Sequence, residues 1–120
     1  MNYSDLFDLI RYGYTKFSYN NRYGKALIPL RYFLELTYRC NLSCPYCYVG
    51  EERNKKELTT DEWKKVIDKC RKNYIPQLTF TGGEPTIRKD LIELIDYSKW
   101  FITRLNTNGV LLTKELCKNL

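Results

Sequence analysis

Three times after residue 28, a segment with the two-residue period of a β-strand is followed by one with the period of an α-helix. The strand segments are 30–37, 77–81 and about 100–107, and the helical segments are 60–72, 90–99 and 114–120. This βαβαβα order predicts an α/β fold whose parallel strands are joined by right-handed crossovers. At 120 residues the chain is one domain at most, and three such units are too few to close a barrel.

The ends of the predicted elements carry recognisable signals. In the first strand, apolar Tyr32, Leu34 and Leu36 alternate with residues of the other face. Two capping boxes, Thr59 with Glu62 and Asp90 with Glu93, are predicted to start the first two helices, and Thr113 caps the last. The buried stripe of the first helix is predicted to comprise Trp63, Val66, Ile67 and Cys70.

Residues 1–28 differ from this pattern and are predicted to form an N-terminal leader segment ahead of a core at 29–120. The start of this segment carries acidic residues where a signal peptide would carry positive charge, and it lacks a continuous apolar run, so it does not resemble a signal peptide. No stretch of the chain approaches the roughly 20 apolar residues that a membrane span needs. The predicted location is therefore the cytoplasm, with no membrane partner.

Net charge is +6, but the basic residues are spread along the chain rather than grouped. We therefore predict no nucleic-acid partner. Histidine is absent altogether, which excludes His-dependent catalytic triads and His-containing zinc sites.

Three of the five cysteines, Cys40, Cys44 and Cys47, follow the first strand in a CxxxCxxC spacing. Three thiolates from one loop can converge on a metal centre, whereas a structural zinc site requires four protein ligands. Iron–sulfur clusters also usually take four thiolates, so three leave one iron open to another ligand. An incomplete zinc knuckle and an electron-transfer cluster completed by another chain remain alternatives. Cys70 and Cys117 are explained by helix packing.

Two further segments follow the second and third strands. In TGGEP (81–85), the glycines allow close approach of the backbone to a ligand, and Pro85 restricts Glu84 to an extended conformation. In NTNGVLL (106–112), Asn-Gly is also a strong hairpin signal, but we favour a strand-to-helix turn because Thr113 follows so soon. All three segments follow the carboxyl ends of parallel strands, the side on which α/β folds bind ligands.

With CxxxCxxC, Tyr46 before the third cysteine, GGEP and TNG in this order, residues 31–116 resemble the radical S-adenosylmethionine (radical SAM) superfamily. The resemblance implies that residues 29–120 are the first three βα units of its core, the N-terminal half of a partial (β/α)6 barrel similar to a TIM barrel. It implies that Cys40, Cys44 and Cys47 ligate three irons of a [4Fe-4S] cluster. It also implies cofactor-binding positions for S-adenosylmethionine at Tyr46, Gly82, Gly83, Glu84, Asn106, Thr107 and Asn108. No catalytic side chain is assigned.

The activity that the resemblance implies is reductive cleavage of S-adenosylmethionine to a 5′-deoxyadenosyl radical, which abstracts hydrogen from a substrate. The cofactor carries this chemistry, and a flavodoxin or ferredoxin is the expected one-electron donor. The motifs look most like the peptide- and protein-modifying maturases, so a peptide or protein substrate is expected. A cyclase of molybdenum-cofactor synthesis, in which GGEP also precedes basic residues (here Arg88 and Lys89), is an alternative. A non-catalytic iron–sulfur or zinc-binding module is another.

The chain stops after three units, so we expect a fragment of a longer enzyme, or a partner chain that completes the barrel. By itself it is expected to be inactive.

Overall fold

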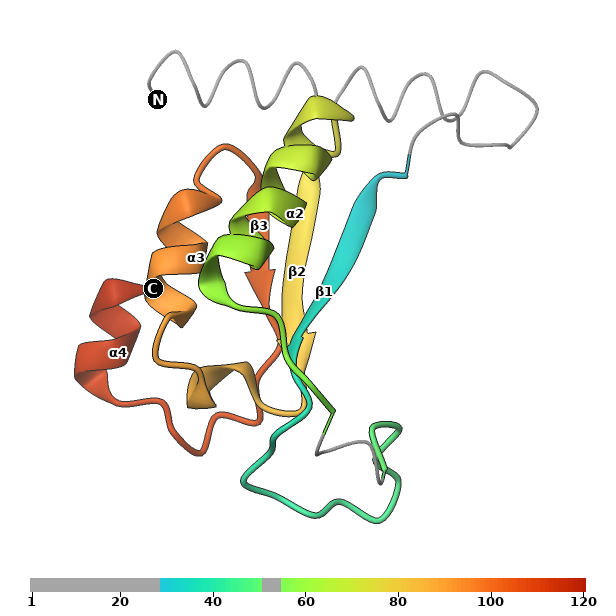
Figure 1. Ribbon diagram of the computed structural model, residues 1–120. Coiled ribbons are helices and arrows are strands. Elements are labelled where there is room, and N and C mark those ends of the chain that lie inside the picture. Colours follow the sequence, from blue (N-terminus) through green and yellow to red (C-terminus); the bar gives the residue numbers. More distant parts are fainter. Residues whose placement is uncertain (1–28, 51–54) are drawn as a thin grey trace.

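The computed structural model describes residues 29–50 and 55–120 (Figure 1). The predicted leader at 1–28 therefore lies outside the described residues. The strands are β1 (Arg31–Thr37), β2 (Gln77–Gly82) and β3 (Ile102–Leu105), and the helices are α2 (Thr60–Lys72), the short 3₁₀ helix η2 (Pro85–Ile87), α3 (Leu91–Tyr97) and α4 (Lys114–Asn119). The strands form one parallel sheet in the order β1-β2-β3, which confirms the α/β fold class.

The strand register places equivalent apolar residues side by side on one face of the sheet. Leu34 on β1 pairs with Phe80 on β2, which pairs with Leu105 on β3. Paired residues in a parallel sheet point to the same face, so this row faces the helices. Phe33 belongs to the next row and is 59% exposed, because its side chain points away from them.

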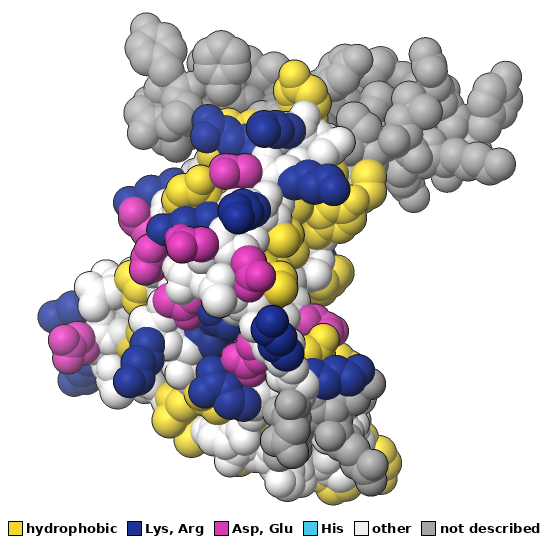
Figure 2. Space-filling model, in the orientation of Figure 1, with side chains coloured by type: hydrophobic (Ala, Val, Ile, Leu, Met, Phe, Trp, Pro, Cys, Tyr) yellow, Lys and Arg dark blue, Asp and Glu magenta, His cyan; other side chains and the backbone are white. Residues whose placement is uncertain are grey.

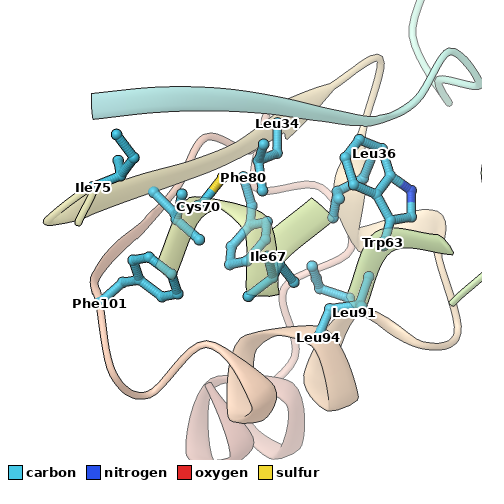
Figure 3. Packing of buried hydrophobic residues seen from close by; sticks show 11 residues of the cluster. Leu34, Leu36, Trp63, Ile67, Cys70, Ile75, Phe80, Leu91, Leu94 and Phe101 are labelled. Carbon is cyan, nitrogen blue, oxygen red and sulfur yellow. The ribbon is translucent and has the colours of Figure 1, made fainter. Parts of the chain in front are cut away.

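The core lies between this sheet face and helices α2 and α3 (Figure 3). Ile67 and Leu94 meet the strand residues there and are almost fully buried. The predicted stripe of α2 is confirmed, since Trp63, Ile67 and Cys70 are buried and Val66 packs against them. So is the capping box: the Thr59 hydroxyl accepts from the Glu62 backbone N–H, and the Glu62 carboxylate accepts from the Thr59 N–H.

Figure 2 shows the outer side of the helices, where lysine and arginine side chains are interspersed with acidic ones. This interspersion agrees with the scattered basic residues of the sequence. None of the helices described is long and apolar enough to cross a membrane.

The predicted capping box at Asp90 and Glu93 is wrong. Asp90 does precede α3, but its side chain makes no capping hydrogen bond. Its carboxylate instead accepts from the Arg88 guanidinium at 2.6 Å and from the Thr60 hydroxyl at 2.6 Å. A charged partner forms stronger hydrogen bonds than a backbone amide does, so the Asp90 carboxylate binds Arg88 instead of capping the helix.

The third strand is shorter than the pattern suggested. Phe101 turns into the core, with its ring edge-on to Trp100 at 4.8 Å between centroids, and β3 begins only at Ile102. Asn108-Gly109 forms a turn that leads to α4 and no hairpin, as predicted. Gly109 has a φ of +78°, and the Thr113 hydroxyl accepts from the Leu116 N–H to start α4.

The packing of α2 predicts that substitution of a buried residue lowers the free energy of unfolding far more than substitution of an exposed residue on the same helix. Ile67→Ala should lower the free energy of unfolding by about 2–5 kcal/mol, because it opens a cavity at a side chain that is 1% exposed. Lys65→Ala, on the exposed side of the same helix, should change it by less than about 0.5 kcal/mol. Denaturant unfolding followed by circular dichroism compares the two, and equal effects would contradict the described packing of α2.

Candidate functional site

The three segments singled out in the sequence meet at one edge of the sheet. The cysteine loop leaves β1, the GGEP segment leaves β2 and the NTNG turn leaves β3, all at the lower edge of the sheet in Figure 1. Parallel strands place their carboxyl ends together, so this arrangement follows from the topology. The contacts between the segments are specific and involve both backbone and side chains.

The two glycines bring the GGEP backbone against the start of the cysteine loop. The Gly83 N–H donates to the Thr37 carbonyl at 2.7 Å, and the Glu84 N–H donates to the Arg39 carbonyl at 2.8 Å. A Cβ on Gly82 would lie 2.3 Å from the Thr37 oxygen, and one on Gly83 would lie 2.3 Å from the Arg39 oxygen. The glycines thus allow close approach to the chain's own backbone, next to Cys40.

Glu84 lies at the centre of these contacts, with its side chain fully buried. Pro85 follows it, and its backbone is extended at φ −136°, ψ 104°, as predicted. One carboxylate oxygen accepts from the Thr86 N–H, the Thr86 hydroxyl and the Thr107 hydroxyl, and the other accepts from the Asn108 N–H at 2.7 Å. Burial alone would raise the pKa of this carboxyl, but the hydrogen bonds from Thr86, Asn108 and Thr107 outweigh it and hold the pKa below the usual range of a glutamate.

The third segment also reaches the cysteine loop directly. The Asn108 side-chain amide donates to the Asn41 side-chain oxygen at 2.9 Å. Asn41 follows Cys40, so this contact lies one residue from a predicted ligand. Among the other predicted residues, Asn106 is exposed, and its N–H extends the sheet by donating to the Phe80 carbonyl at 2.9 Å.

An ion-pair network closes the base of the cysteine loop, and sequence reasoning missed it. The Glu57 carboxylate accepts from the Thr37 hydroxyl, the Tyr38 N–H and the Arg39 guanidinium. Arg88, whose side chain is only 7% exposed, donates to the carbonyls of Leu36 at 2.9 Å and Leu58 at 3.2 Å. We call Arg39, Glu57 and Arg88 the clasp. Arg88 was noticed only as a basic residue after GGEP, and nothing in the local pattern marked Glu57.

The cysteine loop itself is open. Cys44 is exposed, Cys40 and Cys47 are half-buried, and none of the three is in a disulfide. Among the residues that the structure describes, no three Cys, Asp or Glu side chains lie close enough together to hold a metal ion. The ring of Tyr46 is 97% exposed, whereas the Tyr48 hydroxyl donates to the Gly82 carbonyl at 3.4 Å. Cys70 lies in the core, as predicted, but Cys117 is exposed in α4, so the prediction that helix packing explains Cys117 is wrong.

The sequence profile of the Radical SAM superfamily matches residues 34–120, which include all three segments. The chain belongs to the radical SAM superfamily. A "PqqA peptide cyclase" of Bradyrhizobium diazoefficiens is 51% identical over 92 residues, and one of Rhodopseudomonas palustris is 48% identical over 92 residues. Each match covers 73% of this chain but only 24% of the relative, so the chain spans about a quarter of their length.

A solved structure supports the fold at much lower identity. The chain matches Streptococcus suis SuiB, in a crystal structure bound to its precursor peptide SuiA, with a TM-score of 0.71 and 20% identity. The match covers 98% of this chain and 26% of SuiB. The prediction of a partial TIM-like fold is confirmed by this match. The resemblance to the peptide-modifying branch is confirmed by the two relatives, which are peptide cyclases.

The glycine contacts generate a prediction with an internal control. Gly83→Ala should destabilise the protein by about 1–3 kcal/mol or more, because its Cβ would meet fixed backbone atoms that cannot relax independently. Gly50→Ala, with nothing within 4 Å but a φ of +53°, should cost only the left-handed strain of about 1 kcal/mol. Thermal unfolding measures both, and a harmless Gly83→Ala would show that the two segments are not in close contact.

The buried carboxylate of Glu84 predicts a pH dependence. Because the pKa of this carboxyl is lower in the folded than in the unfolded protein, its contribution to stability is fully present above the unfolded pKa and is lost as the pH falls through the folded pKa. Glu84→Gln should therefore be less stable by about 1–3 kcal/mol at pH 7, and it should lose less stability than the unsubstituted protein as the pH is lowered from neutral into the acid range.

The matched control is Glu115→Gln, which removes an exposed carboxylate in α4 and should change stability by less than about 0.5 kcal/mol. Unfolding of the cofactor-free protein across this pH range measures both variants. A pH profile of Glu84→Gln parallel to that of the unsubstituted protein would contradict the assignment.

Proposed function

We propose that this chain is the cluster- and S-adenosylmethionine-binding part of a radical SAM enzyme that modifies a peptide. The observation that carries the proposal is the joining of the cysteine loop, GGEP and NTNG by hydrogen bonds at one sheet edge. Membership of the superfamily and the peptide cyclases among its relatives support it.

Cys40, Cys44 and Cys47 would hold three irons of a [4Fe-4S] cluster. The donor set fits, because thiolates are the usual ligands of iron–sulfur clusters and the three lie in one loop with no disulfide between them. The clasp would hold the base of the loop that carries these ligands. When bound, the cluster and S-adenosylmethionine together supply the one-electron cleavage that gives a 5′-deoxyadenosyl radical.

The protein's own residues would bind and orient the cofactor. GGEP would receive the amino group of S-adenosylmethionine through backbone carbonyls such as that of Gly82, since the Glu84 carboxylate is already engaged by four protein donors. The backbone at Tyr46 would meet the adenine. Asn106, Thr107 and Asn108 would lie towards the ribose or the substrate.

The substrate is proposed to be a peptide, because the relatives are peptide cyclases and SuiB was crystallised with a precursor peptide. A flavodoxin or ferredoxin would deliver the electron to the cluster. We further propose that the protein acts in the cytoplasm and that a longer chain or a partner chain completes the barrel.

The Arg88 side chain does not favour the molybdenum-cofactor cyclase alternative. That resemblance rested partly on basic residues after GGEP, but the Arg88 guanidinium is buried against Asp90 and two backbone carbonyls. It is used to hold the fold together and is not presented to a nucleotide.

The activity is tested by release of 5′-deoxyadenosine from the full-length protein after anaerobic reconstitution with iron and sulfide and addition of a strong reductant. We expect release with the unsubstituted protein. No release from protein whose cluster has been verified would contradict the enzymatic proposal. Zinc without iron, retained equally in air and under argon, would favour a non-catalytic module instead.

The ligand assignment predicts a sharp contrast among cysteines. Cys40→Ala, Cys44→Ala and Cys47→Ala should each lose the cluster, because the loop offers no spare thiolate. Cys70→Ala should keep it and lower stability by about 1 kcal/mol, as expected for a small side chain that is 5% exposed. Iron content and the visible absorption of the reconstituted variants measure this. Loss of the cluster in Cys70→Ala alone would overturn the assignment.

A further inference from the structure

Asn108 makes three hydrogen bonds in three directions, which is more than a turn requires. Its N–H donates to Glu84, its side-chain oxygen accepts from the Val110 N–H at 3.0 Å, and its side-chain amide donates to Asn41 at 2.9 Å. The first two fix the turn after β3 and orient the side chain. The third joins that turn to the cysteine loop, 67 residues earlier in the chain.

The Asn41 end of this contact is next to a predicted cluster ligand. Cys40 precedes Asn41, and its sulfur accepts from the Leu42 N–H at 3.4 Å. The backbone between Cys40 and Leu42 is therefore already shaped around the sulfur, and Asn41 lies in the middle of it. Moving Asn41 would move the backbone that follows Cys40, including the Leu42 N–H that binds its sulfur.

We propose that Asn108 is a positioning residue for the cluster, which acts through Asn41 to hold the first part of the cysteine loop against the turn after β3. This inference rests on the proposed function, because it requires that Cys40 ligates the cluster. It adds a residue that positions the loop carrying that ligand. Asn108 would thus act on the protein's own loop through its side chain, in addition to any backbone contact with the cofactor.

The pair offers a test based on hydrogen-bond direction. Asn41→Asp keeps an acceptor opposite the Asn108 amide, so the contact survives. Asn108→Asp keeps the acceptor for Val110, and the Asn41 amide can rotate to donate to the new carboxylate. Only the double variant N41D/N108D places two acceptors opposite each other with no donor, and the two negative charges repel.

The readout is the rate at which a chelator removes iron from the reconstituted full-length protein under argon. Each single variant is measured for its own effect, and we expect the double variant to release iron about fivefold or more faster than the product of the two single effects predicts. Fivefold corresponds to about 1 kcal/mol of coupling at 1.4 kcal/mol per tenfold, the typical net worth of one hydrogen bond.

Two controls separate positioning from charge and from global stability. N41D/N106D adds two negative charges to the same two segments but leaves the Asn108 amide in place as a donor to residue 41. Its rate of iron release should therefore equal the product of the two single effects. The cofactor-free N41D/N108D variant should remain folded at the assay temperature, since Asn41 and Asn108 are both exposed, so that faster iron release cannot result from unfolding.

If the unsubstituted protein binds the cluster and N41D/N108D releases iron at the rate that the product of the single effects predicts, this inference is overturned and the proposed function remains intact. Equal acceleration by N41D/N106D would also overturn it, because charge alone would then be the cause. Failure of the unsubstituted protein to bind a cluster would overturn both.

Discussion

The buried carboxylate of Glu84 is the interaction on which the rest of this site depends. An ionised carboxyl that is fully removed from water is costly unless its oxygens are hydrogen-bonded, and here protein donors from two segments satisfy them. The donors lie on η2 and on the turn after β3. Burying Glu84 therefore requires both segments to take their observed positions. The arrangement of the site follows from the need to give one buried charge its hydrogen-bond donors.

The backbone of the same residue extends this constraint to the cysteine loop. Its N–H binds the Arg39 carbonyl, so the chain just before Cys40 is held by the residue whose carboxylate holds the third segment. Gly83 makes the approach possible because even a methyl group would collide with the Arg39 oxygen. The resulting site has a hydrogen-bonded base, formed by the sheet edge and the clasp, and a largely exposed loop that carries the three thiols.

The parts of this structure that could be predicted from sequence are those set by local pattern. The apolar stripe of α2 and the Thr59 cap depend on residues within one or two helical turns, and the parallel order of the strands follows from their alternation with helices. Asp90 was misjudged because its partners Arg88 and Thr60 include one that is 30 residues away. The orientation of Glu84 and the role of Glu57 likewise depend on partners brought close only by the tertiary fold.

The clasp has a consequence for how this loop can vary among related chains. Arg39 and Glu57 are 18 residues apart in sequence, and their pairing pins the two ends of the segment between them. An insertion between Cys47 and Glu57 would leave the spacing of the three thiols unchanged, whereas an insertion between Arg39 and Cys47 would alter it. The fold thus separates a stretch whose length does not affect the thiols from one whose length is fixed by their chemistry.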